Sequence, residues 1–311
     1  MNSAIDYRSL RAGDEEKIVP LWNRCLPRDE ISLTTFRRKV ILDPNLDTRG
    51  CQVALSDGTI IGFLLALRRR YPYYDLGLEP EKGWITVFFV DPHHQRRGIG
   101  TALLARGESF LASQNVRDIA MCDYTPNYFF PGVDVEGAAI GHAFLKARNY
   151  HGTLKVYGMG RSLLDVTFPP DLQEIQERLA SAGFSVSLFS PPHALMLLEF
   201  LRQYYPGDLF RVALDRLTEN PECDEILVAL KDGEVVGFSH FQDERFGPFG
   251  IHPGYGGRGL GPLLYYLTVE QMRKKGKHNL WLAWTTGHVK DFYHRMGLRV
   301  LRRHIIMRKT L

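Results

Sequence analysis

The chain has 311 residues, of which 44% are hydrophobic and 24% are charged, and its formal net charge is +4. This composition is typical of a globular protein and excludes disordered and fibrous classes, and the longest apolar stretch, near 194–201, is too short to span a membrane. The basic excess is small and scattered, which favours a small anionic ligand over a nucleic acid. We therefore expect a cytoplasmic protein of two domains that contacts neither membranes nor nucleic acids.

In chain order, the first half is predicted to contain a strand at 6–10, helices at 15–25 and 32–41, a β-hairpin at 53–63, a strand at 84–90, a helix at 101–113, a strand at 118–123, a helix at 138–148 and a strand at 153–159. Strands clustered around a few helices indicate an α+β fold with a mixed, mostly antiparallel sheet flanked by helices.

The second half is predicted to repeat this order with a strand at 185–190, helices at 194–204 and 208–217, a hairpin at 228–238, a strand at 245–251, a helix at 262–275, a strand at 279–284, a helix at 289–295 and a strand at 300–308. A linker is expected near 165–170, before an amphipathic segment at 172–179 that we expect to bridge the halves. The expected domains are therefore 1–164 and 165–311.

An internal repeat supports this division. The segment 53–63, Val-Ala-Leu-Ser-Asp-Gly-Thr-Ile-Ile-Gly-Phe, returns at 228–238 as Val-Ala-Leu-Lys-Asp-Gly-Glu-Val-Val-Gly-Phe, with seven of eleven positions identical. In each copy an Asp-Gly pair separates two β-branched runs, which predicts a hairpin with a two-residue turn.

A second pair of copies lies downstream, at 90–100 and 251–261. The hairpin copies are 175 residues apart and the Gly-rich copies 161 residues apart, so the first half holds 14 extra residues. We place them in the segment 64–83, which is rich in Arg, Tyr and Pro, and expect a long turn or lid there.

Each Gly-rich segment follows a predicted strand and opens a helix, where backbone N–H groups and the helix dipole attract an anion. The segment 254–259 also spells the dinucleotide fingerprint G-x-G-x-x-G. The next strand ends without the acidic residue that such a site uses for the ribose, and the sister loop at 93–98 lacks the glycine pattern. A phosphate site of another kind is therefore favoured.

The first loop, Gln95-Arg96-Arg97-Gly98-Ile99-Gly100, matches the pattern [Gln/Arg]-x-x-Gly-x-[Gly/Ala] and resembles the pyrophosphate loop of the GNAT superfamily of acyl-CoA-dependent N-acyltransferases. The second loop, 256–261, departs from the pattern at its first position, which is a glycine. The resemblance covers nearly the whole chain and implies a tandem form of two GNAT-type domains.

The resemblance implies acetyl-CoA as the co-substrate, with its pantetheine arm paired to the strand before each loop and an N–H of that strand, at 88–90 or 249–251, holding the oxyanion. The expected cofactor residues are Phe89, Val90, Gln95, Arg96, Arg97, Gly98, Ile99, Gly100 and Thr101 in the first half and Ile251, Gly256, Gly257, Arg258, Gly259, Leu260 and Gly261 in the second.

In the family, the helix before the closing strand often carries a tyrosine that protonates the departing thiolate. Tyr293 occupies this place in the second half, four residues before Gly297, whereas Leu145 occupies it in the first. We therefore expect chemistry in the second half, with Tyr293 as the acid. A base is also needed, because a typical amine is protonated at neutral pH, and Glu244, beside Asp243, is our candidate.

Simpler interpretations stay open at this point: Tyr293 as an aromatic residue on the packed face of a helix, and Glu244 as part of a solvated turn. Four separated cysteines, Cys25, Cys51, Cys122 and Cys223, predict neither a zinc site nor disulfides, so no metal is expected. We expect an N-acetyltransferase for a small-molecule amine rather than a protein amine. The alternative is a CoA-binding regulatory module without turnover in one or both halves.

Overall fold

The computed structural model describes residues 4–311, which form two compact units. The first unit comprises 4–156 together with Arg303–Leu311, and the second comprises Tyr157–Arg302. This division differs from the expected 1–164 and 165–311. Two long strands, β7 (His151–Ser162) and β13 (Arg299–Thr310), run through both units, so that one end of each strand belongs to the first unit and the other end to the second. A strand of 12 residues is roughly 40 Å long, about twice the usual length, so each can pair in both units.

The sheet of the first unit has the order β1-β2-β3-β4-β5-β13, and the short strand β6 also pairs with β13. Among the strand pairs described for this sheet, β4 and β5 are parallel and the others antiparallel. The strands of this unit before β13 are β1 (Ile5–Ser9), β2 (Cys51–Ser56), β3 (Thr59–Arg68), β4 (Lys82–Val90), β5 (Asp118–Met121) and β6 (Val133–Asp134). The helices are α1 (Glu15–Cys25), α2 (Leu33–Phe36, continued by a π-helical turn at Arg37–Ile41), α3 (Ile99–Ser113) and α4 (Ala139–Lys146).

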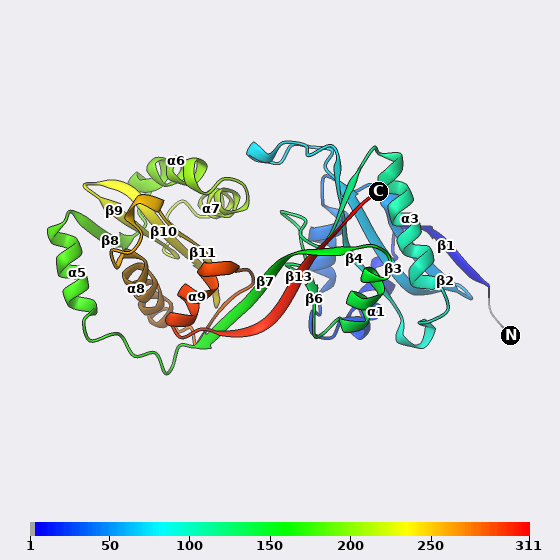
Figure 1. The fold of residues 1–311 in the computed structure, drawn as a ribbon. Coiled ribbons are helices and arrows are strands. Elements are labelled where there is room, and N and C mark those ends of the chain that lie inside the picture. The colour runs from blue at the N-terminus through cyan, green and yellow to red at the C-terminus, as the bar shows by residue number, and fades with distance from the viewer. Residues whose placement is uncertain (1–3) are drawn as a thin grey trace. The chain divides into compact units, whose positions relative to one another are not determined.

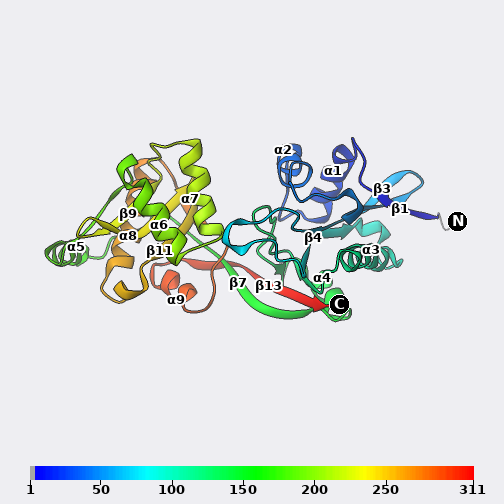
Figure 2. The ribbon, with the colours of Figure 1, turned by 90° about the horizontal axis from the view of Figure 1, so that it is seen from above.

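Helices cover both faces of this sheet, with α1 and α2 on one side of β4 and α3 and α4 on the other (Figure 2). Successive side chains of a strand point to opposite faces, so Phe63 joins the core beneath α1, with Trp22, while Leu64 joins the core beneath α3, with Leu103. These four side chains are completely buried.

The segment 64–83 combines strand and turn. Its first residues extend β3 to Arg68 and its last begin β4, so only the middle forms the long turn that the sequence predicts. The buried Arg69 anchors this turn by donating hydrogen bonds to Glu79 (2.9 Å) and to the carbonyl of Thr125 (2.8 Å).

The second unit has a sheet of the same kind, in the order β7-β12-β11-β10-β9-β8, where only β11 and β12 are parallel. Its further strands are β8 (Phe184–Leu188), β9 (Ile226–Lys231), β10 (Glu234–Gln242), β11 (Arg245–Ile251) and β12 (Asn279–Leu282). Its helices are α5 (Leu172–Ser181), α6 (Ala194–Tyr204), α7 (Asp208–Glu219), α8 (Leu260–Lys274) and α9 (Gly287–Arg295).

In this unit α6 and α7 lie on one face of the sheet and α8 and α9 on the other (Figure 1). The amphipathic segment at 172–179 forms most of α5. Its apolar residues Leu172, Ile175 and Leu179 all join the core beneath α8, so α5 packs against the core of the second unit. Both units are α+β, with a mixed and mostly antiparallel sheet flanked by helices, and the predicted fold class is confirmed.

Candidate acyl-CoA site

The parallel strands β4 and β5 separate part-way along their length. They pair from Lys82 to Ile85, and β5 then ends at Met121, after which Cys122 and Asp123 both have positive φ and turn the chain away. Beyond Ile85, β4 therefore pairs on one side only, with β3, and the other edge of Phe88–Val90 has no neighbouring strand. This edge is available to an extended ligand that pairs with the backbone.

The direction of the backbone groups on this edge follows from strand alternation. The N–H of Asp91 donates to Ile61 of β3 (2.8 Å), so the N–H groups of Val90 and Phe88 point to the opposite, unpaired edge. The carbonyl of Val90 accepts a hydrogen bond from the side chain of Gln95 (3.0 Å), whereas the N–H of Val90 has no partner within residues 4–311.

The loop after β4 is built to leave N–H groups exposed. Asp91 accepts a hydrogen bond from the N–H of His93 (2.9 Å), which fixes the tight turn at Pro92–His94. Gly98 precedes the 15-residue helix α3 with a φ of +82°, and an added Cβ atom there would meet nothing within 4 Å. The open N-terminus of α3, flanked by the exposed Arg96 and Arg97, presents the backbone N–H groups and positive charge that attract an anionic group.

Other residues of the loop serve the fold. Phe89 packs against Trp22 at a ring distance of 5.6 Å and is buried, so only its backbone is available to a ligand. Ile99 is buried in the core beneath α3. Thr101 is exposed, and its hydroxyl accepts a hydrogen bond from Arg148 (2.5 Å), whose guanidinium also lies over the ring of Phe144 (3.6 Å).

The second unit repeats this geometry with one difference. Strands β11 and β12 pair only at Arg245 and Trp281, so most of β11 has an edge without a neighbouring strand. Here the N–H of Ile251 donates to Tyr205 Oη (2.9 Å), and Tyr205 Oη donates to the carbonyl of Ile251 (2.5 Å). The position that corresponds to Val90 is therefore occupied by a side chain of the protein itself.

The Gly-rich loop of the second unit is also more covered. Gly259 has a φ of +92°, and a Cβ atom there would lie 3.1 Å from Ile175 and 3.3 Å from Arg178 of α5. Arg178 donates a hydrogen bond to the carbonyl of Arg258 (3.1 Å). The first residues of this loop stay open, since Gly257 would meet no atom within 4 Å.

Tyr293 lies inside the second unit's core. It is 6% exposed and packs against the rings of Phe246, Phe249 and Phe292 at 6.0, 6.3 and 5.2 Å. Burial raises the pKa of its phenol, and the neighbouring Tyr265 and Tyr205 raise it further. Leu145, at the matching place in the first unit, is also buried, in a core that includes Val90 of β4.

Glu244 lies at the other end of β11 from Ile251. It accepts hydrogen bonds from the N–H groups of His278 (3.2 Å) and Asn279 (2.9 Å), and the adjacent Asp243 pairs with Lys277 (2.7 Å). Desolvation acts to raise the pKa of Glu244, but these hydrogen bonds outweigh it and the pKa lies below its ordinary value. The structure does not bring Glu244 and Tyr293 together, and Glu244 instead ties the start of β11 to β12.

The first unit also has two tyrosines shortly after β5, Tyr124 and Tyr128. Tyr124 is fully buried, and its hydroxyl is held between Asp43 (3.0 Å) and Asn45 (2.8 Å) in a polar network. The carbonyl of Tyr128 accepts a hydrogen bond from Lys39 (2.7 Å). The residues that sequence reasoning missed are Tyr205 and Arg148, and a comparison of the two halves position by position is the signal that would have found them.

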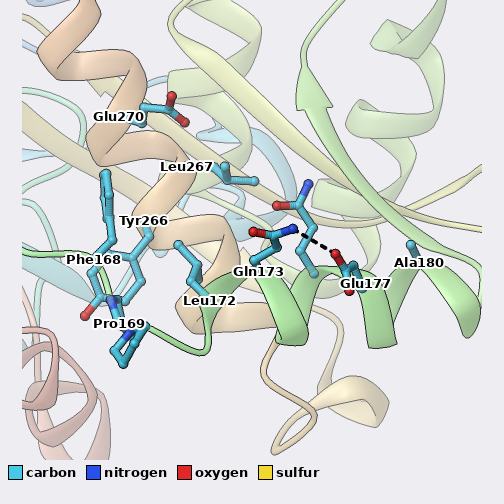
Figure 3. Close-up of a pocket in the computed structure, with 11 residues that line it drawn as sticks. Phe168, Pro169, Leu172, Gln173, Glu177, Ala180, Tyr266, Leu267 and Glu270 are labelled. Atoms are coloured by element: carbon cyan, nitrogen blue, oxygen red, sulfur yellow. Dashed lines mark hydrogen bonds between the residues drawn. The ribbon is translucent and has the colours of Figure 1, made fainter.

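A groove of about 660 Å³ lies between α5 and α8 (Figure 3). Phe168, Leu172 and Tyr266 point into it, and Gln173 donates a hydrogen bond to Glu177 along its rim (2.9 Å). None of its lining residues belongs to β11, to the Gly-rich loop or to α9, so this groove is separate from the strand edge. Within residues 4–311 there is no cluster of side chains suited to a metal ion and no helix long and apolar enough to cross a membrane.

Comparison with known proteins agrees with this geometry. The model of the acetyltransferase (GNAT) family matches residues 15–128 in the first unit and 194–298 in the second. The chain belongs to this family. Its two matched regions make it a tandem GNAT protein, as the repeat predicts. No curated protein matches the sequence.

Solved structures similar to this tandem GNAT chain share its fold at low sequence identity. A GCN5-related glucosamine N-acetyltransferase region of a fungal multidomain GH3 β-N-acetylglucosaminidase has a TM-score of 0.82 and 18% identity over 99% of this chain, which spans 38% of that protein. A GCN5-related N-acetyltransferase from Sphaerobacter thermophilus has a TM-score of 0.71 and 18% identity, covering 98% of this chain and 95% of the other. A tandem GNAT protein from the clavulanic acid biosynthesis pathway has a TM-score of 0.64 and 15% identity, covering 99% and 98%.

Proposed function

We propose that this protein transfers an acetyl group from acetyl-CoA to an amine, and that its first unit holds the acetyl-CoA. The observation that carries the proposal is the unpaired edge of β4 at Phe88–Val90, which leads directly into an open, basic loop at the start of α3. Pantetheine carries amide groups that can pair with this edge as an added strand, while the pyrophosphate is held by the loop N–H groups.

The same edge accounts for the chemistry. The amine attacks the thioester carbonyl carbon, the C–S bond breaks, and the proton lost by the amine is balanced by protonation of the thiolate. The N–H groups of Phe88 and Val90 point to the unpaired edge, where one of them stabilises the charge that develops on the carbonyl oxygen. A fixed donor of this kind typically contributes about 100-fold to 1,000-fold in rate.

For the acceptor we propose a small-molecule amine. The solved structure with the highest TM-score among those described above is a region named as a glucosamine N-acetyltransferase, so an amino sugar is the first compound to test. We also propose a cytoplasmic location. We propose no nucleic-acid partner, because the basic residues that give the net charge of +4 are scattered along the sequence.

A second candidate function applies to the second unit, where Tyr205 occupies the strand edge. That unit would serve as a module without turnover, as the sequence analysis left open. Tyr293 as the acid and Glu244 as the base stay predictions, and substitution of Tyr293 tests the first of them.

The test is a measurement of CoA release from acetyl-CoA by a thiol reagent, with a panel of amines that includes glucosamine, other amino sugars, polyamines and lysine peptides. We expect saturable release with at least one small amine and a stoichiometric calorimetric signal for acetyl-CoA binding. Failure to bind acetyl-CoA at millimolar concentration would contradict the proposal.

A further inference from the structure

Tyr205 separates the strand edges of the two units chemically. It follows the last residue of α6, and its hydroxyl both accepts from the N–H and donates to the carbonyl of Ile251. His252 donates its own N–H to Val236 of β10 (2.8 Å), so by alternation the backbone groups of Ile251 face the edge away from β10. Tyr205 thus takes the two backbone groups that an added strand would use.

The ring of Tyr205 is fixed by its surroundings. A Cβ atom on Gly250 would lie 2.5 Å from the ring, so the ring rests directly on the backbone of β11. Its other neighbours are Phe200 of α6 at 5.7 Å and Phe238 of β10 at 5.8 Å, in tilted and edge-on arrangements that are favourable for aromatic pairs. Tyr205 is therefore held on β11 both by the packing of its ring and by two hydrogen bonds to Ile251.

In the first unit, a leucine occupies the position that corresponds to Tyr205. Helices α1 and α6 both have 11 residues, and the residues that follow them have nearly the same backbone angles: Leu26 has φ −129° and ψ 61°, and Tyr205 has φ −139° and ψ 53°. Both donate their N–H four residues back, to Trp22 and Leu201 (2.7 and 2.8 Å). Leu26 therefore corresponds to Tyr205, but it has no hydroxyl that could reach Val90.

From these contacts we propose that Tyr205 closes the acyl-CoA site of the second unit, so that the protein takes up one acyl-CoA per chain, in the first unit. The residue is an internal substitute for the pantetheine arm on β11. This inference rests on the proposed function in one respect, namely that the ligand of the open edge is an acyl-CoA.

The experiment counts binding sites. Titration calorimetry and equilibrium dialysis with acetyl-CoA, up to millimolar concentration, should give one site per chain for the wild-type protein. The variant Tyr205→Leu copies the first unit and should give two sites, the new one weaker by about one to two decades because Gly256 lacks the polar side chain of Gln95. The reciprocal variant Leu26→Tyr should lose the first site.

The matched control is Tyr204→Phe. It removes a tyrosine hydroxyl from the neighbouring position, where it bonds to His252 (2.9 Å), without touching Ile251, and should keep one site. If Tyr205→Leu does not fold, Tyr205→Phe keeps the ring in place but frees the N–H of Ile251, and a second site should then appear only at high ligand concentration.

Two sites in the wild-type protein, or one site in both Tyr205 variants, would overturn the inference. Failure of the proposed function looks different, because neither the wild-type protein nor any variant would then bind acetyl-CoA at all.

Discussion

Gly98 has a φ of +82° and open space on its Cβ side, and it stands where the pyrophosphate would approach the start of α3. Gly98→Ala should weaken acetyl-CoA binding at least tenfold, because the added methyl group points into this path. Gly58 in the hairpin turn has a similar φ of +77° and equally open surroundings, so Gly58→Ala is a control for backbone strain alone. Equal calorimetric affinities for the two variants would show that Gly98 is not at the site.

Removal of the Tyr293 hydroxyl tests which unit carries out the acetyl transfer. If Tyr293 is the general acid that its sequence position predicts, Tyr293→Phe should lower kcat by about 100-fold to 10,000-fold, the usual effect of losing a general acid. With Tyr205 on the strand edge and Tyr293 in the core, we instead expect turnover within about twofold of wild type. Steady-state kinetics decide: a hundredfold fall in kcat with unchanged acetyl-CoA affinity would return catalysis to the second unit.

His240 is 2% exposed, and burial, together with the charges of Arg216 and Arg245, lowers its pKa from 6.5 to about 4. The unfolded chain therefore binds a proton on this histidine more readily than the folded chain does. The contribution of His240 to the free energy of unfolding is complete above pH 6.5 and is lost as the pH falls toward 4. The loss amounts to about 3 kcal/mol. His240→Leu, which copies the buried Leu65 of the first unit, should remove this pH dependence from denaturant unfolding curves.

The control for this prediction is the exposed His278, whose replacement by Gln should leave the pH dependence unchanged. A His240→Leu variant whose free energy of unfolding still falls by the same amount between pH 6.5 and pH 4 would show that other groups are responsible.

At the scale of elements, α4 and α3 are joined at the loop by Arg148, which bonds to Thr101 in the first turn of α3. The corresponding residue in the second unit, counted from the paired Phe144 and Phe292, is Met296. Arg148→Met should weaken acetyl-CoA binding by about 10-fold to 100-fold, the value of one charged hydrogen bond, and should reduce the dependence of binding on salt. Lys146→Met, at the exposed last position of α4, should have no such effect in salt-dependent calorimetry.

Local patterns predicted the elements of this fold well, because they depend on near neighbours in sequence. The Asp-Gly turns have positive φ at Asp57, Gly58, Asp232 and Gly233, which is what a two-residue hairpin needs. The Gly-rich loops precede helices as predicted, since Gly98 and Gly259 supply left-handed conformations. Each of these features is encoded within about ten residues.

The parts that the sequence did not predict depend on contacts between distant segments. Tyr205 meets Ile251 from 46 residues away, and nothing in the local pattern around either residue predicts the contact. Glu244 had the right chemistry for a base, but its position at the start of β11 places it against His278 and Asn279 instead. Residue type therefore predicts candidates, whereas strand register determines which groups they contact.

At the scale of the whole molecule, the last strand links the stability of the first unit to the end of the chain. Residues Arg303–Leu311 of β13 belong to the first unit, where Met307 pairs with Met121 of β5. The side chain of Met307 is fully buried in the core beneath α3, the helix that begins at the Gly-rich loop. The sheet of the first unit is therefore complete only when β13 is in place.

Met307→Ala should accordingly destabilise the first unit by about 2 to 5 kcal/mol, the cost of removing a large buried side chain. Leu301→Ala, on the same strand but 57% exposed and within the second unit, is the matched control and should be nearly neutral. Hydrogen exchange distinguishes the units, because amides of β5 should lose protection in Met307→Ala while those of β12 keep it. Acetyl-CoA affinity should fall with the first unit's stability, and loss of protection in β12 alone would show that the final strand supports the second unit instead.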